Sequence, residues 1–98
     1  MSIDQLRLLS IDDLVILKYL SESQLGVTAI AGKMQLSQPA ITQRIRKMED
    51  IYRDKILSRK GRGVELTPFG IVLATRASAA LGALDPLVPQ SQSPISEP

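Results

Sequence analysis

The fold of this chain is decided by residues 28–52, which read TAIAGKMQLSQPAITQRIRKMEDIY. Ser37 is a favourable helix N-cap, and Pro39 is tolerated in a helix only within its first turn. A helix is therefore predicted from Gln38 to about Tyr52. Its apolar residues recur at helical spacing on one side, which is expected to face the core: Ile41, Ile45, Met48 and Tyr52.

A second helix is predicted directly before this one. Thr28 is a good N-cap for a helix from Ala29 to Gln35, whose apolar residues would be buried: Ile30, Ala31 and Met34. A turn of about three residues separates the two helices, and a further helix lies upstream. Together they form the pattern of a helix-turn-helix, in which the second of the two helices contacts DNA.

The upstream helix is indicated by its first turn and its periodicity. Ser10 to Asp13 has the form of a capping box, with Asp in the position usually held by Glu. Apolar residues then recur at helical spacing as far as about Ser23: Leu14, Leu17 and Leu20. Residues 24–27, which include Gly26, are predicted to form a turn.

Residues 56–66, which read ILSRKGRGVEL, contain two short extended pieces on either side of a basic tip. This pattern predicts a two-stranded wing. A tight hairpin that needs positive φ explains both Gly61 and Gly63. The alternative is a phosphate-cradling loop, but a lone G-x-G without a following Gly or Lys-Ser/Thr matches it weakly. Thr67-Pro68, a cap followed by proline at the first helical position, predicts a last helix that runs to about Leu84.

The composition excludes most catalytic chemistry. The chain has 98 residues, which at roughly 100 to 200 residues per domain make one domain. It has no Cys and no His, so it lacks disulfides, metal sites built from thiolate or imidazole ligands, and every nucleophile that needs an imidazole. The neighbouring carboxylates of Asp12-Asp13 and Glu49-Asp50 would point about 100° apart on helices. We therefore expect no enzymatic activity, no metal and no cofactor.

No stretch has the pattern of an export signal or of a membrane span. The longest apolar span, Phe69 to Leu84, contains Arg76 and is shorter than the roughly 20 residues that a bilayer crossing needs. We therefore expect a cytoplasmic protein without membrane contact. Its domain is predicted to span residues 1–84, followed by a disordered Pro/Ser-rich tail over residues 85–98.

The charge is distributed unevenly along the chain. Residues 33–62 contain nine basic and three acidic side chains, a net charge of +6, whereas the whole chain carries +2. The remaining residues therefore carry −4. Such a block is expected for a surface that binds a polyanion. The alternative is a solvated helix face with ion pairs between residues four apart, such as Arg46 with Asp50.

The side of the predicted 38–52 helix opposite the apolar stripe is polar and has no acid near its start. Such a helix fits the DNA major groove, where Gln pairs with adenine, Arg pairs with guanine and a Thr methyl touches a thymine methyl. Its start would take a phosphate, and the wing tip would lie along the backbone or in a narrow minor groove. Arg44 falls nearer the buried side, so we expect it to reach a phosphate or to pair with an acid. The candidate DNA-binding residues are Thr28, Ser37, Gln38, Pro39, Thr42, Gln43, Arg46, Lys47, Lys60 and Arg62.

The last predicted helix, 68–84, has more apolar surface than one small domain can cover. We therefore expect a homodimer that forms through this helix. The alternative is that a short helix within residues 3–9 covers it in the same chain, with Ile3, Leu6 and Leu9. The candidate dimerisation residues are Val72, Leu73, Arg76, Ala80 and Leu84.

Three stretches, over about residues 11 to 84, resemble the winged helix-turn-helix domain of LysR-type transcriptional regulators. They are Thr28-Ala-Ile-Ala, Ser37-Gln-Pro-Ala-Ile-Thr-Gln-Arg-Ile-Arg-Lys-Met-Glu49 and Ser58-Arg-Lys-Gly-Arg-Gly-Val-Glu-Leu-Thr-Pro-Phe-Gly70. The resemblance implies a mainly α fold with a β wing, a recognition helix in the major groove, and a dimer on interrupted inverted repeats. The family's DNA-contacting positions fall on Ser37, Gln38, Pro39, Thr42, Gln43 and Arg62.

The chain departs from the family pattern at several places. Arg53 stands where a glycine usually follows the recognition helix, Leu57 stands where Phe is common, and Gln43 stands where Arg is frequent, so base preference is not carried over. Members normally continue into an effector-binding domain, whereas this chain ends at Pro98. It is either an excised DNA-binding domain or a natural single-domain protein, and the proline-rich tail favours the second.

Two functions of different classes compete on this sequence. The leading one is sequence-specific binding of double-stranded DNA as a dimer, which would regulate transcription without a small-molecule effector domain in this chain. The alternative is a protein-interaction module that pairs with a full-length regulator through its last helix and modulates it. Binding of single-stranded RNA is disfavoured, because the stacking aromatic residues are missing.

Overall fold

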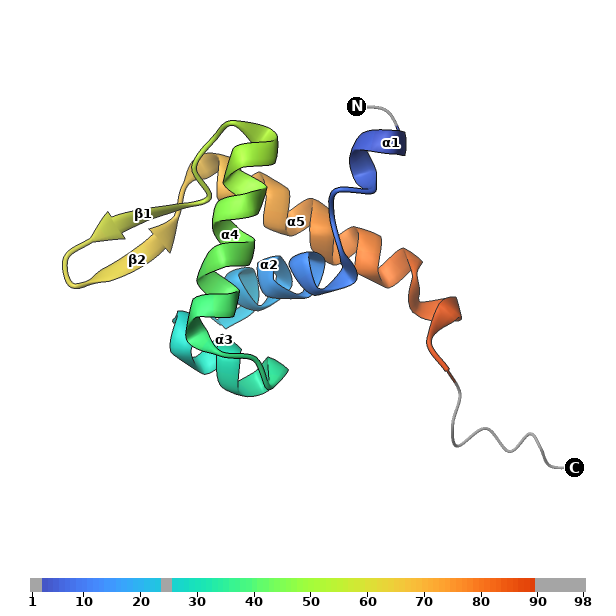
Figure 1. Cartoon of the computed structure of the whole chain (residues 1–98), viewed down its shortest axis with the longest axis horizontal. Helices are drawn as coiled ribbons and strands as arrows, with labels where there is room; N and C mark the ends of the chain where they lie inside the picture. Colours follow the sequence, from blue (N-terminus) through green and yellow to red (C-terminus); the bar gives the residue numbers. More distant parts are fainter. Residues whose placement is uncertain (1–2, 24–25, 90–98) are drawn as a thin grey trace, which may run out of the picture.

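The computed structural model describes residues 3–23 and 26–89 and shows a winged helix-turn-helix (Figure 1). It is mainly helical, with a single antiparallel sheet of two strands in the described residues. The predicted fold class is thereby confirmed. In chain order the elements are α1 (Ile3–Leu6), α2 (Ile11–Ser23), α3 (Val27–Met34), α4 (Gln38–Tyr52), β1 (Leu57–Lys60), β2 (Gly63–Leu66), α5 (Pro68–Ala83) and the 3₁₀ turn η1 (Asp85–Leu87).

Helix α2 is the centre of the arrangement. It lies along α5, with which it makes its most extensive contact, and α4 crosses in front of both (Figure 1). Helix α3 packs against the start of α4, and the wing projects from the side of the body. The far end of α5 extends past α2 and away from the body. These directions leave α4 and the wing accessible on one side of the molecule.

The capping box that starts α2 is present as predicted. The backbone N–H of Ser10 donates to Asp13 Oδ2 over 2.9 Å, and the N–H of Asp13 donates to Ser10 Oγ over 3.2 Å. Two of the backbone donors that a helix start leaves unpaired are thus satisfied reciprocally. The helix runs to Ser23, the predicted end.

The start of α3 differs from the prediction. Thr28 is not the N-cap, because Gly26 takes that position in an extended conformation and α3 already begins at Val27. Glycine is an acceptable N-cap, and α3 therefore begins two residues earlier than predicted. The predicted turn over residues 24–27 is therefore wrong at Val27, and residues 24–25 lie outside the described residues. At the other end Gln35 is left-handed, with φ of 56°, and α3 stops at Met34.

Helix α4 has the predicted bounds. The Oγ of Ser37 accepts a hydrogen bond from the N–H of Ala40 over 3.2 Å, which confirms the cap. The helix ends at Tyr52, and Arg53 caps it in the left-handed conformation with φ of 55°. A left-handed residue after the last helical turn is common, and it is usually glycine. Arg53 keeps this geometry although a non-glycine residue is strained at such a φ.

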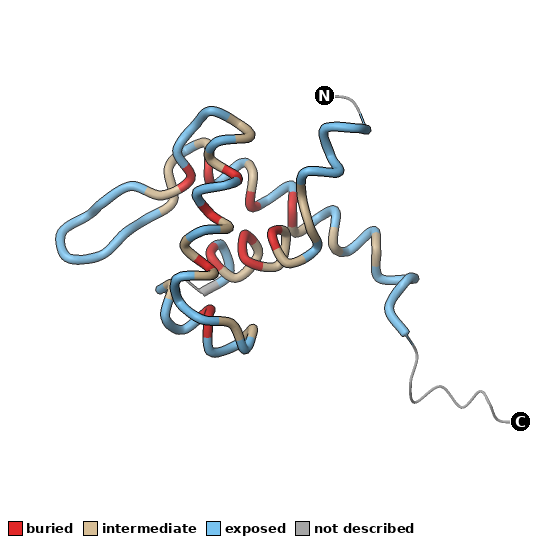
Figure 2. The backbone as a smooth tube through the Cα atoms, viewed as in Figure 1, coloured by how far each residue is buried: buried red, intermediate tan, exposed pale blue. Residues whose placement is uncertain are grey.

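The core is aliphatic and collects where α2, α3, α4 and the first half of α5 meet (Figure 2). Three of the four predicted inward residues of α4 are buried there, and Tyr52 is half-buried against Phe69, with ring centroids 5.7 Å apart. Small residues of α5 fill the contact with α2. The buried apolar residues are Ile16, Leu17, Leu20, Ile30, Ala31, Ile41, Ile45, Met48, Ile56, Ala74 and Ala77.

The wing is a tight hairpin with Leu57 opposite Leu66 and Lys60 opposite Gly63. Only one of its two glycines needs the conformational freedom that the sequence suggested. Gly61 has φ of 59°, whereas Gly63 has no positive φ and pairs in the ladder as the first residue of β2. The prediction of positive φ at Gly63 is therefore wrong, because the turn requires it only at its first position.

The N-terminal segment does not provide the cover of α5 that the sequence offered as the alternative to a dimer. Ile3 is 76% exposed and Leu6 is 50% exposed, so α1 leaves both apolar side chains in solvent. Leu9 alone of the three packs against the core. At the C-terminal end, η1 stands where the sequence placed the start of a disordered tail. The predicted tail residues 90–98 lie outside the described residues.

Gly70 on α5 lies against the backbone of Ile56, and Gly70→Ala should destabilise the fold. A Cβ there would lie 2.4 Å from the backbone oxygen of Ile56. Because a backbone oxygen cannot turn aside, we expect the free energy of unfolding to fall by about 1–3 kcal/mol. Urea unfolding followed by circular dichroism measures this change.

Gly32→Ala is the matched control, since Gly32 is also helical and a Cβ there meets nothing within 4 Å. It should leave stability unchanged or raise it by up to about 1 kcal/mol. Equal losses in both variants would contradict the proposed close contact.

Candidate nucleic-acid interface

Helix α4 presents a polar face to solvent. Gln38, Pro39, Gln43 and Arg46 are exposed, and Thr42 is half-buried at the edge of the same face. The first turn of α4 contains no acid, and its N-terminal N–H groups carry partial positive charge. This face therefore has donors, a methyl group and a guanidinium available to a ligand that lies along the helix.

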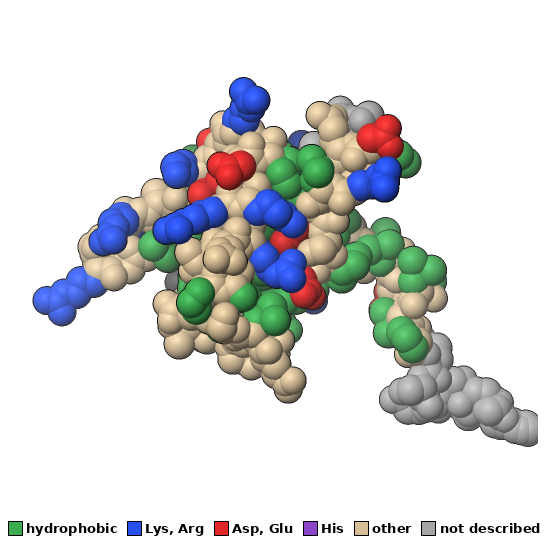
Figure 3. All heavy atoms as spheres, in the orientation of Figure 1, with side chains coloured by type: hydrophobic (Ala, Val, Ile, Leu, Met, Phe, Trp, Pro, Cys, Tyr) green, Lys and Arg blue, Asp and Glu red, His purple; other side chains and the backbone are tan. Residues whose placement is uncertain are grey.

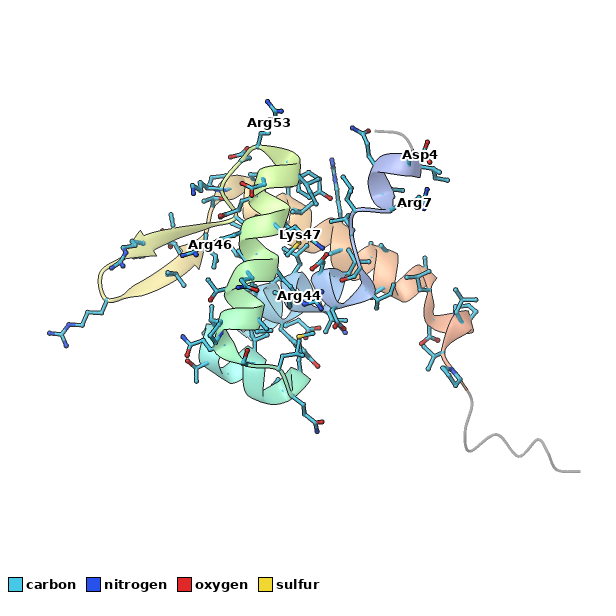
Figure 4. All side chains as sticks on the ribbon, in the orientation of Figure 1. Asp4, Arg7, Arg44, Arg46, Lys47 and Arg53 are labelled. Carbon is cyan, nitrogen blue, oxygen red and sulfur yellow. The ribbon has the colours of Figure 1, made fainter. Side chains whose placement is uncertain are left out.

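The wing adds a second basic element. Arg59, Lys60 and Arg62 are exposed, and basic side chains gather along the hairpin to its tip (Figure 3). Lys60 Nζ lies 3.5 Å from Glu65, but both side chains are more than half exposed, so this pair contributes little. Arg46 points from α4 toward the wing (Figure 4). The wing and the exposed face of α4 thus form one basic surface.

The other two basic residues of α4 lie beside carboxylates of α2. Arg44 donates from Nη1 to Ser10 Oγ over 3.0 Å and lies 3.6 Å from both Asp12 Oδ2 and Asp13 Oδ1. Of the two roles predicted for Arg44, the structure shows pairing with an acid. Lys47 Nζ lies 3.0 Å from Asp13 Oδ2. Its charge is therefore matched by a carboxylate of the same chain.

Asp13 was not among the sequence candidates, although a signal for its burial was present. It precedes Leu17 by four residues and Leu20 by seven, so it lies on the apolar face of α2. Its side chain is 0% exposed. Burial, and next the negative charge of Asp13, raise the pKa of Tyr52 above its ordinary value of 10.0. The charge of Asp13 therefore also affects the hydroxyl of Tyr52, the last residue of α4.

The remaining candidates lie on α3, at the N-cap of α4, and on or just after α5. Thr28 is exposed in the first turn of α3, and Ser37 is exposed at the start of α4. On α5, Val72, Arg76 and Ala80 are exposed, whereas Leu73 and Leu84 are half-buried and Leu73 packs against its own core. The candidate dimerisation residues therefore lie on more than one side of α5.

Neither a metal site nor a membrane span is found in residues 3–23 and 26–89. No group of three or more Asp and Glu side chains there is placed to hold a metal ion. None of the helices in these ranges is both long enough and apolar enough to span a bilayer.

The sequence of this chain is similar to those of known proteins. The family model described as bacterial regulatory helix-turn-helix protein, lysR family, matches residues 11–71. The HTH-type transcriptional regulator PcaQ of Agrobacterium fabrum is 38% identical over 61 residues, which cover 62% of this chain and 20% of that protein. The uncharacterized regulator YraN of Bacillus subtilis is 35% identical over 72 residues, 74% of this chain and 25% of that protein. The chain thus spans about a fifth to a quarter of the length of these relatives.

Solved structures agree with the fold. The CbnR DBD in complex with DNA superposes with a TM-score of 0.70 at 26% identity and covers 79% of this chain and 87% of that chain. The BenM DBD in complex with catB site 1 DNA gives a TM-score of 0.73 at 24% identity, over 92% of this chain and 99% of that chain. The relatives are named as transcriptional regulators, not as enzymes.

Ser37 is the cap on which the start of α4 depends, so Ser37→Ala should lower the free energy of unfolding by about 1 kcal/mol. The physical reason is the loss of the hydrogen bond from Ala40 N–H to Ser37 Oγ. Ser37→Asp should restore the stability, because Asp caps a helix as well as Ser. Thermal unfolding of both variants measures the effect. A Ser37→Asp variant as unstable as Ser37→Ala would contradict the role of the cap.

Proposed function

The chain belongs to the LysR family of bacterial regulatory helix-turn-helix proteins, which are DNA-binding regulators of transcription, and we propose that it binds specific double-stranded DNA sequences as a homodimer. The observation that carries this proposal is the basic surface formed by the exposed face of α4 and the wing. We also propose a cytoplasmic location, because a bacterial regulator that binds DNA meets that DNA in the cytoplasm.

In this proposal α4 lies in the major groove and distinguishes bases. Gln43 and Arg46 are exposed on the outer face of α4, and no carboxylate pairs with Arg46 in the described part of the chain. Gln reads adenine and Arg reads guanine through paired hydrogen bonds, while the methyl of Thr42 would touch a thymine methyl. The CbnR and BenM DBDs, which share this fold, were solved with DNA bound.

Phosphate contacts fix the position of α4. The uncapped N–H groups at Ser37 and Gln38 would hold one phosphate, and Lys60 and Arg62 would follow the backbone beside the groove. Arg62 stands at the tip of the hairpin, and the described residues include no carboxylate partner for it. Contacts of this kind give affinity without reading sequence.

The second half of the proposal is a dimer through α5. Beyond its contact with α2, α5 exposes a run of apolar side chains, and α1 does not cover them. Hydrophobic side chains gather along this projecting end (Figure 3). A second copy of the chain is the occupant that supplies a matching surface. Two copies would present two recognition helices to two half-sites of an interrupted inverted repeat.

Arg62→Ala and Gln43→Ala should have different effects on DNA binding. Arg62→Ala should weaken binding to all sequences alike and reduce the salt dependence by about one unit of slope, because one phosphate contact is lost. Gln43→Ala should relax the preference at one base position by about 1–3 kcal/mol. Fluorescence anisotropy with a panel of duplexes at several salt concentrations separates the two. The division of roles is wrong if both variants lose affinity and specificity to the same extent.

Ala80→Glu should convert the dimer to a monomer and lower the affinity for a two-site operator. Ala80 is exposed on the projecting half of α5, so the fold itself tolerates the change, whereas a dimer would bury a carboxylate without a partner. Sedimentation velocity reports the change in mass. Ala29→Glu, at an exposed position of α3, is the control and should leave the mass unchanged. A wild-type chain that is monomeric at high micromolar concentration would remove the dimer from the account.

A further inference from the structure

One charged side chain among the described residues is buried completely. Asp13 is 0% exposed, and its Oδ2 accepts the N–H of Ser10 over 2.9 Å and lies 3.0 Å from Lys47 Nζ. An isolated carboxylate in such a place is strongly disfavoured, so its partners are essential to it. The partner with the positive charge comes from α4, the helix that carries the proposed base contacts.

The second oxygen of Asp13 is less well satisfied. Asp13 Oδ1 is buried and accepts no hydrogen bond, and the cation beside it is Arg44, whose Nη1 lies 3.6 Å away. Arg44 is held in place by Ser10 Oγ at 3.0 Å and by Asp12 at 3.6 Å. Residues 44 and 47 are one turn apart on α4, so both cations reach the start of α2 from the same side (Figure 4). We call this group the Asp13 cluster: Ser10, Asp12, Asp13, Arg44 and Lys47.

The Asp13 cluster constrains the orientation of α4 in a way that the apolar residues of α4 do not. Ile41, Ile45 and Met48 favour burial of one side of α4, but contacts between aliphatic side chains have no direction and permit small rotations and shifts. The ion pairs of Asp13 favour one geometry, because removing the cations from a fully buried carboxylate is strongly unfavourable. A rotation of α4 would move Lys47 and Arg44 away from Asp13 and leave its charge unpaired.

The cluster also changes the charge that α4 offers to DNA. Two of the three basic residues in its middle are matched by Asp12 and Asp13, and only Arg46 remains without a carboxylate in the described residues. A helix with three free cations would bind any phosphate backbone more tightly, because each phosphate contact adds sequence-independent affinity.

We propose that Asp13 is a positioning residue for DNA recognition, which sets the rotation of α4 on the body and keeps the charges of Lys47 and Arg44 from contributing to non-specific binding. The inference rests on the proposed function. It assigns Lys47, a predicted DNA contact, to the Asp13 cluster. Sequence preference then comes from the side chains on the outer face of α4, held at one angle to the groove.

Asp13→Asn tests this role with little change in shape. The amide oxygen still accepts from Ser10 N–H, while the negative charge is lost. We expect the affinity for a random duplex to rise at low salt and the salt slope to steepen by about one to two units, one for each cation released. The ratio of affinities for selected and random duplexes should fall about tenfold. Glu22→Gln makes the same change in net charge at an exposed pair with Lys18 on α2, and it should leave the ratio unchanged.

Lys47→Gln tests the same role from α4 and carries the test if Asp13→Asn does not fold. The affinity ratio should fall because α4 loses its fixed rotation, while the salt slope stays within about 0.3 of the wild-type value. A slope that drops by about one unit would show Lys47 to be a phosphate contact and would overturn the inference. An unchanged slope and ratio in a folded Asp13→Asn variant would overturn it as well.

DNA binding by the wild-type chain distinguishes failure of the proposed function from failure of the positioning role alone. If wild type binds no duplex at any salt concentration, the DNA-binding proposal falls and the positioning role with it. If wild type binds with sequence preference and both variants match it in slope and ratio, only the positioning role falls.

Discussion

Helix α4 buries Ile41, Ile45 and Met48 against the body of the domain, and this contact determines where the candidate residues of α4 lie. Because the three residues occupy one side of the helix, the opposite side must face solvent. That side carries the exposed Gln43 and Arg46. The caps at both ends, Ser37 and the left-handed Arg53, set the length of the helix and bring its N-terminus to the surface. The same residues that build the core therefore orient the proposed DNA contacts.

The wing depends on a second contact, between the start of α5 and the segment before β1. Gly70 approaches the backbone of Ile56 so closely that no side chain fits between them, and Thr67 N–H donates to the oxygen of Ile56 over 2.9 Å. The hairpin is thereby anchored between the end of α4 and the start of α5. It places its basic tip on the side of the molecule to which Arg46 points. Affinity and base recognition are thus proposed to come from neighbouring parts of one surface.

Much of this arrangement could be predicted from sequence, because caps and periodicity act locally. Ser10, Ser37 and Thr67 mark the starts of α2, α4 and α5, and the structure places each helix within a residue of the prediction. The start of α3 was misplaced because Gly26 and Thr28 are both acceptable N-caps, and only the tertiary context selects between them. Likewise, nothing local shows that Ile3 and Leu6 stay exposed instead of covering α5.

The candidate site was harder to predict than the fold. A helical wheel places Lys47 at the edge of the outer face, but it does not show that a carboxylate of another helix lies 3.0 Å away. Asp13 is 34 residues from Lys47 in the sequence, and its side chain is 0% exposed. Its role in the site therefore depends on how α2 and α4 cross. Charge patterns along a sequence count cations, whereas the structure separates those that are already paired from those that remain available.

Selection of bound sequences from a random double-stranded DNA library, performed with the full chain, tests the central claim most directly. A dimer that reads DNA through two α4 helices should enrich an interrupted inverted repeat, with half-sites separated by about one helical turn, roughly 10 base pairs, or a multiple of it. A library that shows no enrichment of any sequence after repeated rounds, although the protein retains DNA, would contradict sequence-specific recognition by α4.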